Sequence, residues 1–399
     1  MTIYPFPQKT KKNILALGAE SDGNFCFFDA DKIYFSESFG DLLEEKNWHA
    51  YQKAVLNFLK KNKFKPNMIL TDLHPLYLTS VWGEELSKLY KAKYIQVQHH
   101  LAHIFSVIGN KLLQDTRYEI QDTIYGLAMD GTGYGEDGKI WGGEVFELSN
   151  KKIARIGHLE NQILIGGDLA VREPARMLIG ILDKFLTKTK VYNFVKNYYT
   201  KNEFELIHNQ LKQNFNCLET SSTGRVLDAV SLLLGFCRNE RKYKHEPIAL
   251  LEANSAKPYA DIKPKIILSQ GKQVLNTTLL FEYLVKNLHK DKKRLAATAQ
   301  LYISQGLYEI IKNSCHPERS PYSDEVEGST CKYHQRYSTE DSSTPLRYAQ
   351  NDIFTAGGIA NNKIISEYLI SQGTYANNRI PRGDAGLSFG QIFYYLISQ

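Results

Sequence analysis

Short apolar runs, separated by polar turns and helical patterns, organise the N-terminal part of the chain. Apolar runs that we predict to form strands lie at 14–18, 25–28, 32–35, 68–70 and 94–97. A helical spacing of apolar residues covers 44–61, and another helix is expected to begin near His99, directly after the last of these runs. Hairpin, helix, strand and helix in this order predict an α/β fold.

A second series of the same kind begins at Ile124, where an apolar stretch ends in the acidic, glycine-rich segment 130–135. The first series also has an acidic segment with a glycine at its first bend, residues 20–23. This repetition predicts a duplicated fold with a cleft between two lobes. The expected parts are a first lobe (1–118), a second lobe with a helical insertion (119–386) and a C-terminal helix that packs back on the first lobe (387–399).

The second lobe contains two stretches of different character. Residues 170–308 are mostly helical by pattern, with one helical stretch expected over 194–213. Residues 315–352 have no hydrophobic period and are rich in polar residues and proline, so they cannot bury enough apolar area to offset the entropy of ordering. We predict a disordered surface insertion there, without a catalytic part. A zinc site from its cysteines and histidines is disfavoured, because Cys315 and His316 are adjacent.

Composition narrows the class of protein. A chain of 399 residues suggests two or three domains. The net charge of +6 is small and the basic residues are scattered, so no nucleic-acid partner is expected. Five cysteines without a CxxC pair argue against a disulfide framework and favour a reducing, cytoplasmic location. We find no apolar run of membrane-spanning length and no secretory signal, so no membrane partner is expected.

The glycine-rich segment is the first candidate for chemistry. Asp130 is followed by Gly131, Thr132, Gly133 and Gly135, between two apolar stretches. Glycines let backbone N–H groups approach an anion closely, and a neighbouring carboxylate can orient a metal or a nucleophile. The segment therefore predicts a phosphate-binding turn between two strands. An ordinary glycine-rich hairpin is the alternative, because Gly and Asp also dominate turns.

Histidines at the start of the predicted helix form the second candidate. On a helical wheel His99 and His103 lie about 40° apart, and the apolar face lies opposite them. Two imidazoles at this spacing can bind one ion, whereas His100 points about 100° away and is a poorer ligand. A further ligand is needed, and Asp384, in a Pro/Gly turn before the last helix, is our candidate. The alternative is a surface helix that happens to carry histidines.

These motifs, in this order, resemble the carbamoyltransferase half of HypF, a family of nickel–iron hydrogenase maturation proteins. The resemblance covers nearly the whole chain apart from 315–352. Its most specific pieces are 97–103, 130–135 with 141–144, 221–228, 357–362 and 384–391. It implies a two-lobed, duplicated actin/Hsp70/sugar-kinase-like (ASKHA) fold, similar to that of the tRNA threonylcarbamoyl-transfer enzymes.

The resemblance also implies an activity. The family passes a carbamoyl group from carbamoyl-adenylate to a C-terminal cysteine of the partner HypE, and this group later becomes a cyanide ligand. The implied metal, Fe or Zn, would be held by His99, His103 and Asp384, with Asp130 as a further catalytic residue. ATP or the AMP moiety of carbamoyl-adenylate is the implied nucleotide, and Mg²⁺ is compatible with it.

Further residues are implied in nucleotide binding. They are Gly131, Thr132, Gly133, Gly135, Gly166, Gly167, Asp168, Arg172, Asp228, Gly357, Gly358 and Asn362. The glycines up to 167 would cradle the phosphate, Asp228 would hold the ribose, and Gly357 and Gly358 with Asn362 would line the adenine. For Asp168, Arg172, Asp228 and Asn362 the alternative is a helix cap or a turn, where such residue types are common.

The chain also departs from the family pattern. The acylphosphatase-like, zinc-finger and YrdC-like regions are absent from this sequence, so we expect a separate YrdC-like protein to supply the intermediate. Asp22-Gly23 stands where the family has Lys-Asn, and Glu246-Pro247 where it has Glu-Gly. Two alternatives stay open: a small-molecule O-carbamoyltransferase of the nodulation or antibiotic type, and an inactive remnant that only binds HypE.

Overall fold

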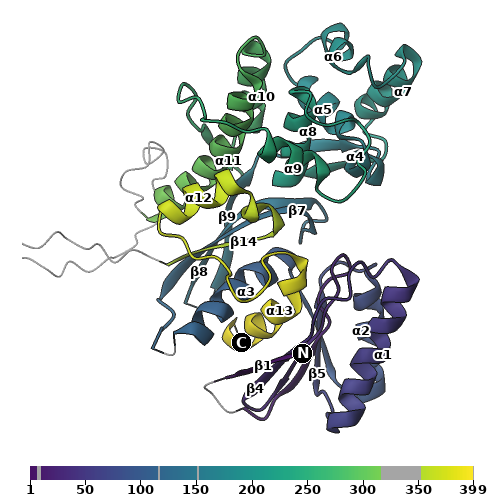
Figure 1. The fold of residues 1–399 in the computed structure, drawn as a ribbon, viewed down its shortest axis with the longest axis vertical. Helices are drawn as coiled ribbons and strands as arrows, with labels where there is room; N and C mark the ends of the chain where they lie inside the picture. Colours follow the sequence, from purple (N-terminus) through teal and green to yellow (C-terminus); the bar gives the residue numbers. More distant parts are fainter. Residues whose placement is uncertain (7–9, 116, 151, 316–351, 399) are drawn as a thin grey trace, which may run out of the picture.

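The computed structural model describes residues 1–6, 10–115, 117–150, 152–315 and 352–398. The predicted insertion at 315–352 therefore lies outside the described residues, except for its two ends. The two-lobed α/β architecture expected from the sequence is confirmed. Each lobe is built on its own sheet, and the more helical lobe lies above the other in Figure 1.

The first sheet has the order β1-β4-β3-β2-β5-β6. Its strands are β1 (Thr2–Pro5), β2 (Asn13–Ala16), β3 (Cys26–Asp29), β4 (Lys32–Phe35), β5 (Met68–Asp72) and β6 (Lys93–Val97). β2, β3 and β4 pair antiparallel, whereas β5 pairs parallel to β2, and β6 parallel to β5. The strand β1, which the polar N-terminus did not predict, pairs with β4 at the edge.

Helices cover both faces of this sheet, because successive strand residues point to opposite sides. Leu15 and Ile69 pack under α1 (Glu45–Asn62) and α2 (Leu78–Tyr90). Ile14 and Leu70 belong instead to the core that contains α3 (His99–Gln114) and α13 (Leu387–Ser398). The second core therefore lies between the two lobes rather than within one of them.

The second sheet repeats the pairing of the first. Its strands are β7 (Thr123–Tyr134), β8 (Ile140–Ser149), β9 (Lys152–Leu159), β10 (Gln162–Ile165), β11 (Cys217–Thr220), β12 (Ile266–Ser269), β13 (Lys272–Leu275) and β14 (Ile353–Ala356). β7, β8 and β9 pair antiparallel, and β14 joins β7 in parallel, as β5 joins β2. The equivalent pairing in both sheets confirms the predicted duplication.

Most helices of the second lobe form the helical insertion at the top of Figure 1. The helices of this lobe are α4 (Asp168–Arg172), α5 (Pro174–Leu182), α6 (Lys188–Val195), α7 (Lys201–Lys212), α8 (Thr223–Leu233), α9 (Glu246–Ala253), α10 (Thr277–Lys286), α11 (Lys292–Cys315) and α12 (Lys363–Ser371). The expected helical stretch over 194–213 is two helices, because Thr200 starts α7 with a capping box to Glu203. The largely helical 170–308 also contains β11, β12 and β13.

The predicted turn at 130–135 is a strand in the structure. β7 runs on to Tyr134 with a register shift between Met129 and Gly133, and the chain turns only after it. Two glycines of this segment, Gly133 and Gly135, make room for neighbouring rings. A side chain on Gly133 would overlap the ring of His100, and one on Gly135 would overlap Trp141.

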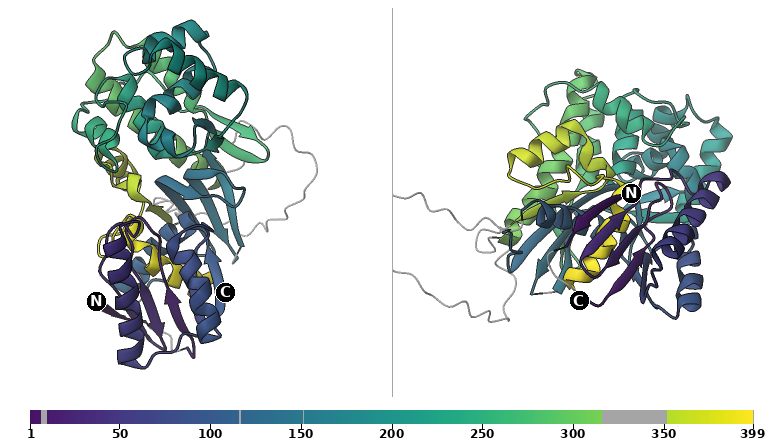
Figure 2. Two further views of the ribbon diagram at one scale, coloured as in Figure 1. Left: turned by 90° about the vertical axis from the view of Figure 1, so that its right-hand side faces the viewer. Right: turned by 60° about the horizontal axis from the view of Figure 1, so that its bottom comes forward.

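The lobes meet through α3 and α13, which lie together between the two sheets (Figures 1 and 2). α3 contacts β7 and β14 of the second sheet, and α13 contacts β2, β3 and β5 of the first. The two helices cross closely at Gly390, where an added Cβ would lie 1.8 Å from the carbonyl oxygen of Ala102. Among the described helices, none combines the length and the apolar character needed to cross a membrane.

We expect Gly390→Val to destabilise the protein by at least about 2 kcal/mol, because the new side chain would collide with backbone that cannot yield. Thermal unfolding followed by circular dichroism measures this effect. Gly383→Ala is the matched control, since nothing lies within 4 Å of its added Cβ. Its expected change is within about 0.5 kcal/mol. Equal melting temperatures for Gly390→Val and the parent chain would show that α3 and α13 do not need this crossing.

Candidate functional site

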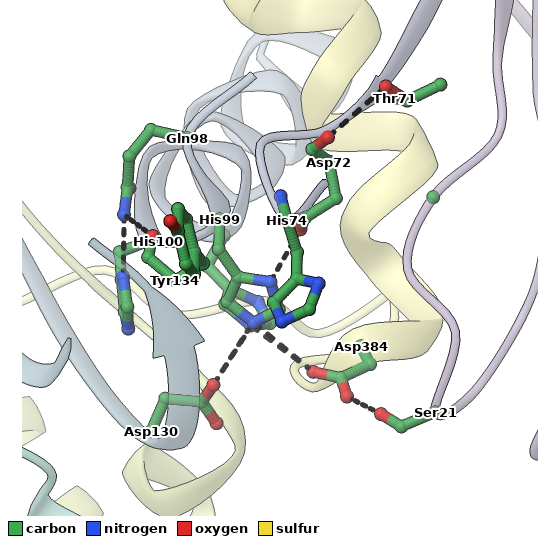
Figure 3. Close-up of polar contacts among 12 residues, drawn as sticks. Ser21, Thr71, Asp72, His74, Gln98, His99, His100, Asp130, Tyr134 and Asp384 are labelled. Carbon is green, nitrogen blue, oxygen red and sulfur yellow. Dashed lines mark hydrogen bonds and ion pairs between the residues drawn. The ribbon is translucent and has the colours of Figure 1, made fainter. Parts of the chain in front are cut away.

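Four segments that are distant in sequence bring acidic and imidazole side chains to one point between the lobes (Figure 3). His99 and His103 come from the first two turns of α3, and Asp130 from the irregular end of β7. Asp384 begins a short 3₁₀ helix, η4 (Asp384–Gly386), directly before α13. Asp72 ends the buried strand β5 and stands behind His99.

The distances describe a compact group. His99 Nε2 lies 3.2 Å from Asp130 Oδ2 and 3.8 Å from Asp384 Oδ1. His103 Nε2 lies 3.7 Å and 3.5 Å from the same two oxygens. One ligand atom from each of the four residues lies within 4.8 Å of the others. Two imidazole nitrogens and two carboxylate oxygens suit a divalent transition metal such as Zn or Fe.

One nitrogen of each histidine ring is directed at the centre of the group, as a bound cation requires. Within the described chain, His103 Nε2 is a buried nitrogen without a hydrogen-bond partner. His99 Nδ1 lies 2.7 Å from Asp72 Oδ2, so its other nitrogen faces the group. A carboxylate behind a metal-ligating histidine fixes the ring and its tautomer and raises the basicity of the ligand. Asp130 is oriented in turn by Gly358, whose backbone N–H donates to Oδ1 at 3.2 Å.

Burial and charge compete within this group. Burial alone would lower the pKa of His99, but Asp72 and Asp130 outweigh it and raise that pKa well above its usual value. The pKa of His103 is raised as well, because Asp130 and Asp384 outweigh burial. The two histidines hold the pKa of Asp130 well below its usual value despite its burial. The raised pKa values of the two imidazoles favour their positively charged form beside these carboxylates.

The histidines are not on a surface helix, so that alternative is wrong. His99 and His103 are at most 2% exposed, and their side of the helix faces Asp72 of β5, Asp130 of β7 and Asp384 of η4. The divergence expected for His100 is observed: its Nδ1 lies 3.0 Å from Gln98 Nε2, and it is not part of the four-residue group. Burial lowers the pKa of His100 to about 3 and keeps that ring neutral.

A cavity of about 1480 Å³ opens beside the group and reaches from the first lobe to the helical insertion. Of the residues that the sequence assigned to catalysis or nucleotide binding, those on its wall are Asp130, Gly131, Thr132, Arg172, Gly358 and Asp384. The expected cleft between the lobes is therefore present, and it ends at the candidate metal group.

Other residues assigned to the nucleotide lie away from this wall. Gly166 and Gly167 form the bend before α4, with Gly166 N–H donating to Asn216 O, and Asp168 is in the first turn of that helix. Gly133 and Gly135 make room for rings, as described above. Gly357, with a φ of 97°, lies so close to the Met129 carbonyl that a Cβ would be 2.2 Å from it.

Asp228 and Asn362 have structural partners of their own. Asp228 is buried and does not line the cavity; its Oδ2 is 3.0 Å from Nη1 of Arg225, which does. Burial raises the pKa of the Asp228 carboxyl. Asn362 accepts from Ile365 N–H at the start of α12, and its amide donates to Gln300 Oε1 at 2.6 Å. Asn362 thus occupies the helix-cap role that was its alternative, and Asp228 anchors an arginine that lines the cavity.

Sequence reasoning missed three residues around the group. Asp72 had no assigned role, although an Asp at the end of a buried strand is a signal that the sequence does contain. The Ser21 hydroxyl donates to Asp384 Oδ2. Lys244 Nζ lies 2.8 Å from that hydroxyl and 3.3 Å from Asp384 Oδ2. Lys244 lies in an irregular stretch between α8 and α9, where no local pattern marks it.

Comparison with known proteins gives consistent matches along the chain. Residues 9–110 match the family model "HypF Kae1-like domain", and residues 126–321 match "Carbamoyltransferase, Kae1-like Domain, second subdomain". A relative from Methanocaldococcus jannaschii, "Probable carbamoyltransferase HypF", is 37% identical over 401 residues, covering 97% of this chain and 46% of the relative. "Carbamoyltransferase HypF" of Rhodobacter capsulatus is 24% identical over 396 residues, covering 96% of this chain and 46% of its own.

Solved structures agree with these matches. A crystal structure of full-length HypF in a phosphate- and nucleotide-bound form superposes with a TM-score of 0.80 and 25% identity, over 98% of this chain and 47% of the other. A HypF from T. kodakarensis gives a TM-score of 0.79 and 28% identity, over 99% and 49%. The chain spans about half the length of the relatives and structures that it matches.

We expect the double variant His99→Ala/His103→Ala to lose stoichiometric metal, because it removes both imidazole ligands of the group. Elemental analysis of purified protein measures this, and circular dichroism checks the fold. Asp384→Asn, which keeps the side-chain volume, should also bind metal more weakly. His49→Ala is the matched control, since His49 lies exposed on α1. Full metal content in the double variant would contradict the assignment.

We expect Asp72→Asn to weaken metal binding by about tenfold to a hundredfold without removing a ligand, because Asp72 only orients His99. Competition against a chromogenic chelator measures the affinity. Asp261→Asn, at a surface ion pair with Lys290, serves as control. An unchanged affinity in Asp72→Asn would show that the ring of His99 is held by packing alone.

Proposed function

Because the chain belongs to the HypF carbamoyltransferase family, we propose that it transfers a carbamoyl group from carbamoyl-adenylate to the C-terminal cysteine of HypE. The observation that carries this proposal is the position of the four-residue group, His99, His103, Asp130 and Asp384, at the wall of the cavity between the lobes. A related structure of full-length HypF contains phosphate and nucleotide, which supports an adenylate as the ligand.

The residues of the group fit the chemistry of such a transfer. A divalent metal, when bound there, supplies a Lewis acid for the carbonyl or phosphate oxygens of a mixed anhydride. Asp72 holds His99 in place, and the Gly358 N–H holds Asp130. Two of the four candidate metal-binding side chains are therefore oriented before a metal or a substrate binds. Preorganised groups of this kind need no rearrangement when charge develops in the transition state.

The attacking group comes from the partner in this proposal. The thiolate sulfur attacks the carbamoyl carbon, the bond from that carbon to the phosphate oxygen breaks, and AMP leaves with the electron pair. None of the cysteines in the described part of the chain lines the cavity. Burial raises the pKa of Cys26 well above its usual value and that of Cys237 to about 11, so neither is a thiolate near neutral pH.

The size of the cavity is consistent with two ligands. Sites for single small molecules usually measure roughly 300–1000 Å³. The cavity here, at about 1480 Å³, leaves room for an adenylate and for the end of a peptide chain. A YrdC-like domain would supply the carbamoyl-adenylate from ATP and carbamoyl phosphate.

Reconstitution tests the proposal. The chain is mixed with a YrdC-like domain protein, ATP, carbamoyl phosphate and HypE, and intact-protein mass spectrometry follows HypE. We expect a mass increase of one carbamoyl group on HypE, lost when its C-terminal cysteine is replaced by serine. The increase should also vanish after metal removal by a chelator and return when the metal is restored. Carbamoylation at the same rate without this chain, or none with it, would contradict the proposal.

A further inference from the structure

Lys244 links the helical insertion to the candidate metal group across the cavity. Its ammonium lies 2.8 Å from the Ser21 hydroxyl and 3.3 Å from Asp384 Oδ2. Ser21 follows β2 of the first sheet, and Asp384 precedes α13, whereas Lys244 lies between α8 and α9. All three side chains line the cavity, so this contact spans it from one lobe to the other.

The two oxygens of Asp384 face different groups. Oδ1 is directed at His99 and His103, at 3.8 Å and 3.5 Å, and Oδ2 is directed at Lys244 and Ser21. A metal ion bound through Oδ1 would leave the contact of Lys244 with Oδ2 intact. The ammonium would then lie one carboxylate group away from the metal. An anion bound at the metal group from the cavity side would then be attracted by the metal ion and by the Lys244 ammonium.

The ammonium is also free to take a ligand. A lysine has three N–H donors, and Ser21 and Asp384 account for two of them. The Lys244 side chain is 53% exposed, and it lines the cavity.

The surrounding charges make a cation necessary at this end of the cavity. Asp22 and Asp41 line it beside Ser21, and Asp130 and Asp384 complete an acidic rim. The bend that follows β2, residues 17–24, contains no lysine or arginine. A phosphate brought to the metal past these carboxylates would be repelled unless a nearby cation offset them. Other basic residues line this cavity, among them Arg241 and Arg382, but of the described lysines and arginines on its wall Lys244 is the one that forms an ion pair with a carboxylate of the four-residue group.

We propose that Lys244 binds the phosphate of the adenylate and places it on the metal group, a role that rests on the proposed function and deepens it. The reaction increases the negative charge on this phosphate as AMP leaves, and an ammonium fixed beside it stabilises that charge. Ser21 and Asp384 hold the ammonium in position before the ligand arrives. Metal content distinguishes this role from one in which Lys244 only holds Asp384 in place.

The experiment compares AMP with adenosine, two ligands that differ only in the phosphate. Calorimetry on the metal-loaded chain measures the affinity of both ligands for the parent chain, Lys244→Met and Lys244→Arg. Lys188→Met is the matched control, because Lys188 is a 40% exposed lysine that pairs with Glu205 on the surface. Metal content is measured on every variant.

We expect Lys244→Met to weaken AMP binding about tenfold to a hundredfold, the effect of losing one charged hydrogen bond, with adenosine binding and metal content unchanged. Lys244→Arg should recover part of the loss, because it keeps the charge. Equal losses for AMP and adenosine would overturn the proposal and make Lys244 a structural tether. Loss of metal from Lys244→Met would overturn it in favour of a role in holding Asp384.

AMP binding and carbamoyl transfer by the parent chain show whether a negative result concerns Lys244 alone or the proposed function as well. If the parent chain transfers carbamoyl groups and binds AMP, while Lys244→Met binds AMP as tightly, only the role of Lys244 fails. If the parent chain neither binds AMP nor transfers carbamoyl groups, both fail together.

Discussion

Three carboxylates around the ring of His99 are the constraint on which the rest of this structure depends. Asp72 faces its Nδ1, whereas Asp130 and Asp384 face its Nε2; Asp72 and Asp130 are buried, and the Asp384 side chain is 14% exposed. Buried charges need partners, and here the partners are imidazoles, one ammonium and a backbone N–H. The close crossing of α3 and α13 serves this arrangement, because it fixes where β5, β7 and η4 end relative to one another.

Local periodicity explains what the sequence could predict about the site. The spacing of His99 and His103 depends only on the helical repeat, and the helix is present where the pattern indicated it. Asp384 was found because a Pro/Gly turn before an apolar helix is also a local signal. Asp72 and Lys244 act through side chains far away in sequence, so only the tertiary structure identifies them.

The glycine-rich segment shows where local signals fail. Glycine is selected both where a chain turns and where a ring lies against a strand, and the sequence looks the same in both cases. In β7 the rings of His100 and Trp141 occupy the space above Gly133 and Gly135. The order of elements was nevertheless predictable, since the repeated hairpin-and-crossover pattern depends on short-range hydrophobic periods. Strands β11 to β13 were not, because they are short and lie between helices.

The candidate ligands come from both lobes, and this has a thermodynamic consequence. His99 and His103 belong to α3, Asp130 to the second sheet and Asp384 to the segment that leads back to the first. An ion bound by all of them favours the approach of the lobes, and so does a nucleotide in the cavity that they enclose. By linkage, each ligand must then increase the affinity of the other by the same factor. In the proposed function, metal and nucleotide would therefore be heterotropic effectors of one another, and the apparent dissociation constant of each would depend on the concentration of the other.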